Sequence, residues 1–438
     1  MIIDKITIQD LSIFHNDEEQ SVFHHLNFTQ TSSGREWLRY FLSTPLETVE
    51  KIKETQNIIK RILSVHEQWP VKISNGTVMV IERFYETAID ALPSHPNAVN
   101  TFIYQITNAS DYSIAKYSVT HFIDFVQGLN ELMYVLCDEN NPKLLKNIIG
   151  RVDQLLQRPD IVDMLAYKKS QPLSAIKILQ YANFIRNHFK QQSLELIETY
   201  SKLDAYYSMA IACKRYEYCF PEVMVSDEPK LSATQLFHPL LQTPVAYDID
   251  LRKEHNFLFL TGANMAGKST FIKAVGLSTY LAHIGMAVPA KQMQLSLFDG
   301  LLSNINVVDN IVKGESYFFN EVQRIKNTIE KISDGKKWLI LIDELFKGTN
   351  VQDAMKCSTT VIEGLRKMSN ALFILSTHLY EIGDGLKQYS NIQFRYFETT
   401  ATDDQLVFNY QLKEGISNDR LGYLILKKEG VVDILNKL

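Results

Sequence analysis

Residues 257–276, FLFLTGANMAGKSTFIKAVG, constrain the fold of this chain more than any other stretch. The apolar run from Phe257 to Leu260 predicts a buried strand. After a short glycine-containing loop, the residues from Ser269 onward have helical periodicity. The G-x-x-x-x-G-K-[ST] spacing of a phosphate-binding loop is met by Gly262, Gly267, Lys268 and Ser269. Such a loop directs backbone N–H groups at one point, where the dipole of the following helix also favours an anion. The sequence therefore predicts a strand, a loop and a helix that bind nucleotide phosphates.

Each part of this loop has a chemical reason to contact a nucleotide. Lys268 would reach the β- and γ-phosphates, and the Ser269 hydroxyl would bind Mg²⁺. The alternative is a tight glycine turn with an incidental lysine, which the flanking strand and helix disfavour. The predicted contacts to ATP phosphates are Gly262, Asn264, Met265, Gly267, Lys268, Ser269 and Thr270.

Two further apolar strands end in polar side chains that suit the same site. KWLILIDELFKGTN ends in Asp343, which can hold Mg²⁺, and Glu344, which can activate the water that attacks the γ-phosphate. ALFILSTHLYEI ends at His378, which can hydrogen-bond the γ-phosphate. Taken alone, an acidic pair or a single histidine at a strand end is commonplace. The predicted catalytic residues are Glu344, His378 and Lys268, and the predicted Mg²⁺ ligands are Ser269 and Asp343.

The chain divides into a helical first half and an α/β second half. From Ser174 to about Tyr218 the helical pattern contains no Gly or Pro, which predicts one long lever-like helix. The alternative is two shorter helices with a bend near Gln191–Ser193. From about residue 222 strands and helices alternate, which predicts a mixed, mainly parallel sheet. We therefore expect a multidomain protein with an all-α domain at residues 1–221 and an α/β domain at residues 222–438.

The composition of the chain indicates which kinds of partner and compartment to expect. The net charge of −5 gives no overall basic signature for nucleic acid, although a local basic face would be enough. The four cysteines form no C-x-x-C pair, which predicts reduced thiols in a cytoplasmic protein. The start of the chain lacks a signal pattern, and no apolar run approaches the length of a membrane span, so we expect no membrane partner.

Taken together, these segments resemble the MutS family of DNA mismatch-repair ATPases, which have the ABC-type ATPase fold. TGANMAGKST resembles the family loop T-G-P-N-M-G-G-K-S-T, with Ala263 and Ala266 as the differences. GESYFFNEV resembles the signature loop S-T-F-M-x-E-M, and STHLYEI resembles A-T-H-Y-x-E-L. DELFKGTN resembles D-E-x-G-R-G-T-S, with Phe346 and Lys347 in place of Gly-Arg. Upstream segments, including residues 26–46, extend the resemblance over most of the chain.

The resemblance implies an all-α core and lever domain followed by a P-loop ATPase domain of the ABC type. It implies Mg²⁺-dependent ATP hydrolysis in a dimer, expected to be a homodimer, in which each nucleotide is completed by the signature loop of the other subunit. Ser316 and Glu321 would act there in trans. Tyr247 would contact the adenine, although packing at the edge of the sheet is the alternative role for this side chain.

The resemblance also implies that the chain binds DNA, but two features of the sequence depart from the family pattern. The helical core starts near residue 1, so we expect no mismatch-reading domain ahead of it, and residues 50–200 are short for a lever with an inserted clamp. We expect an ATP-gated dimeric clamp that recognises duplex or branched DNA by shape, in DNA repair or recombination. Mismatched-DNA binding and mismatch repair, with specificity supplied by a partner subunit, stay open.

Two classes of function without DNA are alternatives. The first is a MutS-like ATPase with a protein-scaffolding role. A basic stripe at the far end of the helical domain would favour DNA, and an apolar patch there would favour scaffolding. The second is a transporter ATPase subunit, which the absence of an L-S-G-G-Q loop disfavours.

Overall fold

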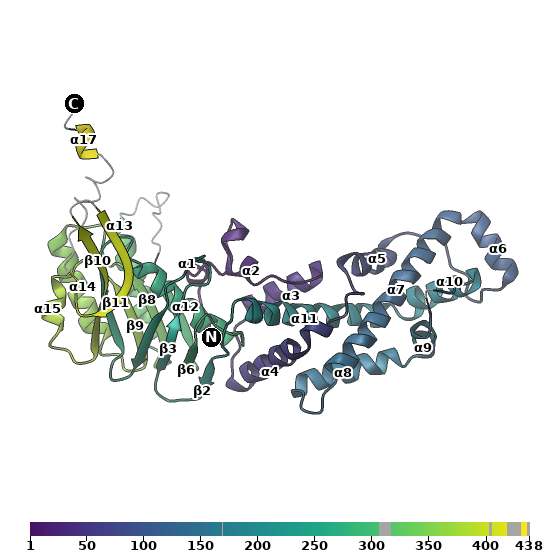
Figure 1. The fold of residues 1–438 in the computed structure, drawn as a ribbon, viewed down its shortest axis with the longest axis horizontal. Coiled ribbons are helices and arrows are strands. Elements are labelled where there is room, and N and C mark those ends of the chain that lie inside the picture. Colours follow the sequence, from purple (N-terminus) through teal and green to yellow (C-terminus); the bar gives the residue numbers. More distant parts are fainter. Residues whose placement is uncertain (169, 306–316, 403–404, 418–430, 436–438) are drawn as a thin grey trace. The chain divides into compact units, whose positions relative to one another are not determined.

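The chain folds into two compact units (Figure 1). The structure, a computed structural model, describes residues 1–168, 170–305, 317–402, 405–417 and 431–435. Unit 1 comprises Met1–His25, Thr44–Lys53 and Tyr216–Leu438, and unit 2 comprises Leu26–Ser43 and Glu54–Arg215. The division differs from the predicted boundary after residue 221, because two N-terminal segments belong to the unit that holds the sheet.

The N-terminal segment belongs to unit 1 because strand pairing and buried hydrogen bonds attach it to the larger sheet. Strand β1 (Ile2–Ile3) pairs in parallel with β7 (Gly300–Asn304). In helix α1 (Lys5–Asp10), Asp10 is buried and accepts hydrogen bonds from the Ser303 hydroxyl and from the Ile305 N–H, the latter at 3.1 Å. A two-residue strand carries no recognisable pattern, so the sequence could not reveal this attachment.

All regular elements among the described residues of unit 2 are helices. Its elements are α3 (Ser32–Ser43), α4 (Val49–Val65, which starts in unit 1), η2 (His66–Gln68), α5 (Asn75–Glu86), α6 (Ala98–Thr107), α7 (Ala109–Leu136), α8 (Lys143–Leu156), α9 (Pro159–Leu165), α10 (Ala175–Asn183), η3 (Phe184–His188) and α11 (Lys190–Arg215). Helix α7 is central, because α5, α6, α8, α9 and α10 all pack against it. Helix α11 packs against α3.

The predicted single helix from Ser174 onward is wrong, and the two-helix alternative is closer to the structure. A π-helical turn, η3, separates α10 from α11, and Phe189 leaves helical geometry with φ −125° and ψ 9°. The interruption precedes the predicted bend at Gln191–Ser193. Phe184 stacks on Phe189 with ring centroids 5.2 Å apart, and Phe189 is fully buried. Phe189 also packs edge-on against Phe122 of α7, with ring centroids 6.3 Å apart. Helical periodicity does not encode this tertiary contact.

A buried carboxylate fixes the start of α3. Asp204, on α11, accepts hydrogen bonds at 2.9 Å from the backbone N–H groups of Gln30 and Thr31, and at 2.7 Å from the Thr31 hydroxyl. Burial raises the pKa of Asp204, although these hydrogen bonds act in the opposite direction. Gly34 leaves the space that the carboxylate needs, since a Cβ there would lie 2.1 Å from Asp204 Oδ2.

Two glycine-to-alanine substitutions in unit 2 should have opposite effects on stability. Gly34→Ala forces the buried carboxylate of Asp204 to move and should lower the free energy of unfolding by about 3 kcal/mol. Gly150→Ala, in α8, meets no atom within 4 Å and should raise it by about 0.5–1 kcal/mol, because alanine has less conformational freedom to lose. Urea denaturation followed by far-ultraviolet circular dichroism measures both changes. Equal effects of the two substitutions would contradict the assigned role of Asp204.

Unit 1 contains a seven-stranded sheet in the order β1-β7-β8-β9-β5-β10-β11. Its other strands are β5 (Phe257–Thr261), β8 (Trp338–Asp343), β9 (Ala371–Ser376), β10 (Ile392–Thr402) and β11 (Gln405–Glu414). All neighbouring strands are parallel except β10 and β11. This confirms the prediction of a mixed, mainly parallel sheet. A four-stranded sheet adjoins it in the order β2-β6-β3-β4, from β2 (Glu222–Met224), β3 (Lys230–Leu236), β4 (Tyr247–Arg252) and β6 (Gln292–Ser296).

Helices cover both faces of the larger sheet, so its central strands are buried on both sides. The helices of unit 1 are α1, η1 (Glu18–Gln20), α2 (Val22–His25), α12 (Lys268–His283), α13 (Tyr317–Ile332), α14 (Val351–Leu365), α15 (Ile382–Leu386) and α17 (Val431–Leu435). In β8, Ile340 and Ile342 pack in one cluster with Ile325 of α13 and Ile362 of α14. Leu341 points the other way, toward α12. The parallel strands β5, β8 and β9 therefore end side by side at one sheet edge, where ligands bind in folds of this kind.

None of the helices in the described ranges combines the length and the apolar character that a membrane span requires. All four cysteines are free thiols, as predicted.

Candidate functional site

The loop between β5 and α12 has an unusual backbone. Gly262 and Gly267 have φ values of +140° and +108°, and Met265 between them has φ +66°. At Gly262 a Cβ would also lie 3.1 Å from the carbonyl oxygen of Phe397. Left-handed residues turn successive N–H groups toward one side and form a concave anion-binding loop. Gly267 caps the N-terminus of α12, where the helix dipole adds to this effect.

Lys268, the first residue of α12, is a buried cation. Its ammonium donates hydrogen bonds to the carbonyl oxygens of Gly262 at 2.8 Å and Ala263 at 2.9 Å. Burial lowers the pKa of Lys268 to about 8, against the opposing effect of the nearby Glu344 and Asp343 carboxylates. The side chain therefore stays near the loop and is mostly protonated at neutral pH.

Glu344 follows β8 and is held as a carboxylate by two donors. His378 Nε2 lies 2.7 Å from Glu344 Oε1, and Lys347 Nζ lies 2.8 Å from Oε2. Burial by itself would raise the pKa of Glu344, but these two hydrogen bonds outweigh burial and lower it to about 2. Because a carboxylate only accepts, Nε2 of His378 carries the proton in this pair. The same nitrogen then cannot accept from Lys268 Nζ, which lies 3.4 Å away.

Asp343 lies at the last position of β8, next to Ser376 at the end of β9. It is buried, and its Oδ1 accepts a hydrogen bond from the Ser376 hydroxyl. Its charge also acts on Lys268. A hard oxygen donor therefore lies within electrostatic reach of the loop.

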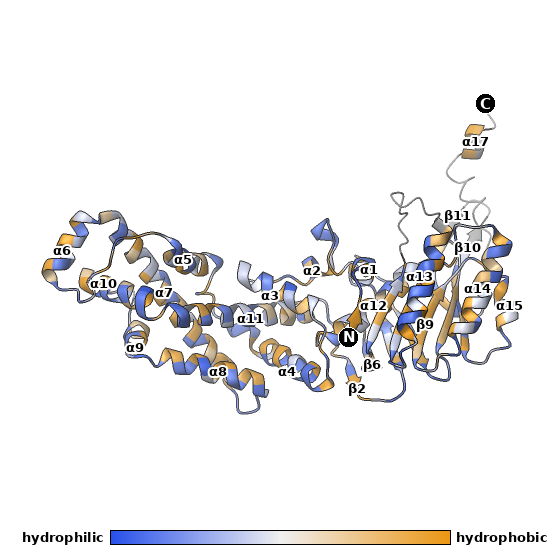
Figure 2. Ribbon diagram, turned by 180° about the vertical axis from the view of Figure 1, so that it is seen from behind, coloured by the Kyte–Doolittle hydropathy of each residue, from blue (hydrophilic) through white to orange (hydrophobic). Residues whose placement is uncertain are grey.

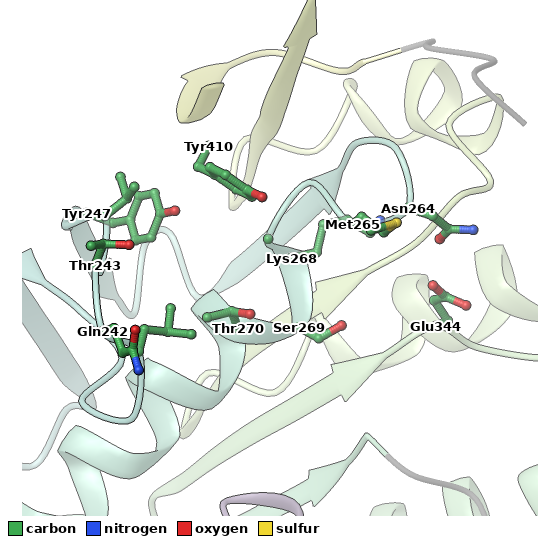
Figure 3. Close-up of a pocket in the computed structure, with 13 residues that line it drawn as sticks. Gln242, Thr243, Tyr247, Asn264, Met265, Lys268, Ser269, Thr270, Glu344 and Tyr410 are labelled. Carbon is green, nitrogen blue, oxygen red and sulfur yellow. The ribbon is translucent and has the colours of Figure 1, made fainter. Parts of the chain in front are cut away.

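A cavity of about 420 Å³, here called the loop pocket, opens beside the loop (Figure 3). Its lining residues are Leu241, Gln242, Thr243, Val245, Tyr247, Asn264, Met265, Gly267, Lys268, Ser269, Thr270, Glu344 and Tyr410. Two tyrosines lie at one end and Glu344 at the other, with the lysine, serine and threonine of the loop between them. Most of the predicted site residues thus line one cavity. Gly262, Asp343 and His378 are not among the lining residues, and the hydrogen bonds and charges above connect them to Lys268 or Glu344.

Of the two tyrosines that line the pocket, the sequence predicted one as a site residue and missed the other. Tyr247, the predicted adenine contact, lines the pocket and also packs edge-on against Phe271 and Phe397, with ring centroids 5.5 and 5.4 Å away. Burial raises the pKa of Tyr247 to about 12. Tyr410, on β11, was not predicted as a site residue. Its strand is recognisable in the sequence, but only the pairing of β11 with β10, and of β10 with β5, brings Tyr410 to the loop.

The predicted signature-loop residues have different outcomes. Ser316 lies outside the described residues. Glu321, on α13, is buried, and its carboxylate accepts hydrogen bonds from the backbone N–H groups of Lys347 at 3.2 Å and Gly348 at 3.3 Å. These contacts are within its own chain, and the action of Glu321 in a partner's site stays a prediction. Glu321 holds the loop that follows Glu344.

Comparisons with known proteins agree with this geometry. The family model described as MutS domain V matches residues 258–435. The DNA mismatch repair protein MutS of Listeria welshimeri is 28% identical over 59% of this chain and 30% of its own length. The protein of the same name from Petrotoga mobilis is 22% identical over 98% of this chain and 63% of its own length. Residues 258–435 are therefore similar to domain V of MutS, and the chain as a whole is similar to MutS proteins.

These matches cover only part of the length of each MutS protein. The MutS protein of Pseudothermotoga lettingae is 30% identical over 52% of this chain but over only 28% of its own length. The chain therefore spans less than two thirds of the length of these relatives. The segment matched by the family model begins in β5 and includes the loop, Glu344, His378 and Tyr410.

The position of Glu321 can be tested without any assay of activity. Glu321→Ala removes the acceptor for two backbone N–H groups, and hydrogen bonds to a charged group contribute about 1.5–3 kcal/mol. Amide hydrogen exchange in residues 345–349 should therefore accelerate about tenfold or more. Glu330→Ala is the matched control, because Glu330 lies on the same helix in an exposed pair with Lys326. Unchanged exchange in Glu321→Ala would contradict the assigned role.

Proposed function

We propose that this chain binds Mg²⁺-ATP in the loop pocket and hydrolyses it. The proposal rests on one observation above all: a buried lysine, a helix N-terminus and a carboxylate at a strand end border the same cavity of about 420 Å³. A cavity of this volume suits a nucleotide-sized ligand, which needs about 300–1,000 Å³. ATP is its substrate, and the residues divide into those that bind the phosphates, the base and the attacking water.

Phosphate binding would depend on Lys268 and the start of α12. The ammonium is already desolvated and lies among backbone carbonyls, so an anionic phosphate is a stronger partner for it than water. Backbone N–H groups of the loop and the dipole of α12 add attraction for the same group. The pocket places the two tyrosines at the far end, where aromatic faces can stack on an adenine.

Hydrolysis would depend on Glu344. The carboxylate is ionised at neutral pH and accepts hydrogen bonds, so it orients a water molecule for attack on the γ-phosphate. With a pKa of about 2 it is a weak base as long as His378 and Lys347 donate to it. When either donor turns to the γ-phosphate, the carboxylate loses that hydrogen bond and becomes more basic. His378 thereby links the presence of the γ-phosphate to the basicity of Glu344.

Magnesium fits the donors of this site when the nucleotide supplies further ligands. The Ser269 hydroxyl and the Asp343 carboxylate would hold it, and both are the hard oxygen donors that Mg²⁺ prefers. No group of three or more His, Cys, Asp or Glu side chains within the described ranges could hold a metal ion. When bound, Mg²⁺ supplies charge neutralisation at the β- and γ-phosphates.

ATP affinity should fall at high pH through Lys268. Because burial lowers the pKa of this lysine to about 8, the free protein loses the proton above that pH, while phosphate binding requires it. The dissociation constant for ATP should therefore rise about tenfold per pH unit between about pH 8.5 and pH 10. Isothermal titration calorimetry measures this rise and the accompanying proton uptake. A flat profile in the wild-type protein would contradict the assignment.

Substitutions separate the binding role from the hydrolytic role. Lys268→Ala should abolish tight ATP binding, whereas Lys268→Arg stays protonated and should bind with little pH dependence. Glu344→Gln should bind ATP as the wild type does but lower kcat by about 100-fold or more. Normal turnover in Glu344→Gln would exclude Glu344 as the group that activates water.

The biological role proposed for this ATPase is to act on DNA as a dimeric, ATP-gated clamp that recognises duplex or branched DNA by shape. Similarity to MutS proteins supports the DNA part of the proposal, because the relatives are named DNA mismatch repair proteins. A homodimer would let the signature loop of one chain complete the pocket of the other.

Binding of labelled DNA tests this role. Fluorescence anisotropy with matched duplex, single-mismatch duplex and four-way junction, with and without ATP and at two salt concentrations, should reveal duplex or junction binding that responds to ATP. Phosphate contacts predict that affinity falls steeply as salt rises. Absence of binding to all three, with ATP hydrolysis intact, would overturn the DNA role.

A scaffolding role without DNA is the second candidate, and one observation favours it. Unit 2 has nearly balanced charge, with 19 Lys and Arg residues against 17 Asp and Glu residues. From Ala91 to Ser110, around α6, the sequence contains none of these four residue types. This part of the helical unit therefore lacks the basic stripe that would attract DNA, so any DNA contact must lie elsewhere on the chain.

A further inference from the structure

The two ends of the loop pocket differ in charge. Among the described residues that line it, Lys268 and Glu344 are the charged side chains, and both lie on the side of the phosphates. The opposite side, here called the base end, carries no charge. It is lined by Leu241, Gln242, Thr243, Val245, Tyr247 and Tyr410. Figure 3 shows Gln242 and Thr243 on the same side as Tyr247. A nucleobase at the base end therefore meets aromatic faces and neutral polar groups.

The aromatic rings of the base end are held in place by the core of unit 1. Tyr247 packs edge-on against Phe271 and Phe397, and both of these rings are fully buried. They belong to the apolar packing around the larger sheet, whose central strand β9 is coloured as hydrophobic in Figure 2. Tyr410 lies over the start of α12, since a Cβ at Gly267 would be 3.4 Å from Cδ1 of its ring. Two aromatic rings are thus positioned beside the phosphate-binding loop before any ligand enters.

The polar groups of the base end, in contrast, are in contact with solvent. Every residue from Leu241 to Ala246 is exposed, so water can solvate a side-chain or backbone group there that a bound base leaves unpaired. A site rejects the wrong base strongly only where such a group is buried, and the rejection can then reach about 10⁴-fold. The Gln242 amide and the hydroxyls of Thr243 and the two tyrosines can each donate or accept a hydrogen bond. They suit the edge of adenine and the edge of guanine alike.

We infer that the loop pocket accepts purine nucleotides as a class and binds GTP nearly as well as ATP. Stacking on an aromatic ring tolerates every base, because each base has a π face, and it strengthens binding by about tenfold or more per base. A purine covers more of the ring than a pyrimidine does, so CTP and UTP should bind less tightly. This inference rests on the nucleotide site of the proposed function, and it is independent of the DNA role.

Isothermal titration calorimetry of the wild-type chain with Mg²⁺ and ADP, GDP or CDP measures this selectivity without hydrolysis. The dissociation constants for ADP and GDP should agree within about fivefold, and that for CDP should be about tenfold higher or more. With the triphosphates, kcat for ATP and for GTP should agree within about twofold, because Lys268 and Glu344 act at the other side of the pocket.

Substitutions of Tyr410 test whether both purines use the same ring. Tyr410→Ala should raise the dissociation constants for ADP and GDP by the same factor, about tenfold or more, because it removes a stacking face. Tyr410→Phe restores the ring and should recover most of this loss for both nucleotides. Tyr134→Ala removes an exposed aromatic side chain in unit 2 and should change neither affinity. Thermal melts verify that the variants are folded.

The possible results distinguish failure of this inference from failure of the proposed function. Binding of ADP with GDP more than about tenfold weaker would overturn the inference and leave the ATPase proposal intact. Equal binding of ADP and CDP would do the same, as would a Tyr410→Ala protein that loses affinity for only one of the two purines. If none of the nucleotides binds, the proposed function fails and this inference fails with it.

Discussion

The burial of one ammonium group, that of Lys268, determines how the site in unit 1 is built. A charge in a low-dielectric interior is costly, and this cost lowers the pKa of the lysine to about 8. Compensation comes from the carbonyls of Gly262 and Ala263, which face the ammonium because the glycine has a φ of +140°. The Glu344 and Asp343 carboxylates, at the end of β8, act in the same direction. A loop, a helix start and two strand ends are thus arranged around a single cation.

Residues with a strained backbone are concentrated around the loop pocket. Seven non-glycine residues in the described ranges have positive φ, and three of them, Met265, Glu344 and Tyr410, line the loop pocket. Left-handed geometry costs about 1–2 kcal/mol for such residues and persists where surrounding contacts enforce it. Phe346, where the MutS pattern has glycine, has φ +59°, and its buried ring packs on Phe318 with centroids 5.7 Å apart. Burying such a ring contributes about 1.5–3 kcal/mol, which offsets the strain and explains how the substitution is tolerated.

Local sequence patterns predict the structure near Gly262 and Glu344. They do not predict contacts between segments that lie far apart in the sequence. The strands β5, β8 and β9 are predictable because burial on both faces makes them continuous apolar runs, and the loop is predictable because its glycine and lysine spacing is local. Tyr410 is not, because its position depends on strand pairing across the sheet. Neither is the attachment of β1 to β7, almost 300 residues further along the chain. Helical periodicity places Glu321 on α13 but does not say which N–H groups lie opposite its carboxylate.

That carboxylate connects α13 to the catalytic candidate. Glu321 holds the backbone of Lys347 and Gly348, and the Lys347 side chain donates to Glu344. One turn further along α13, Arg324 donates to the Ser303 carbonyl at 2.8 Å and lies 3.5 Å from the buried Asp10 of α1. The helix is therefore fastened to the sheet at one contact and to the loop behind Glu344 at another. A displacement of the start of α13 must shift that loop, so the hydrogen bonds that set the pKa of Glu344 respond to the position of a helix that contributes no side chain to the loop pocket.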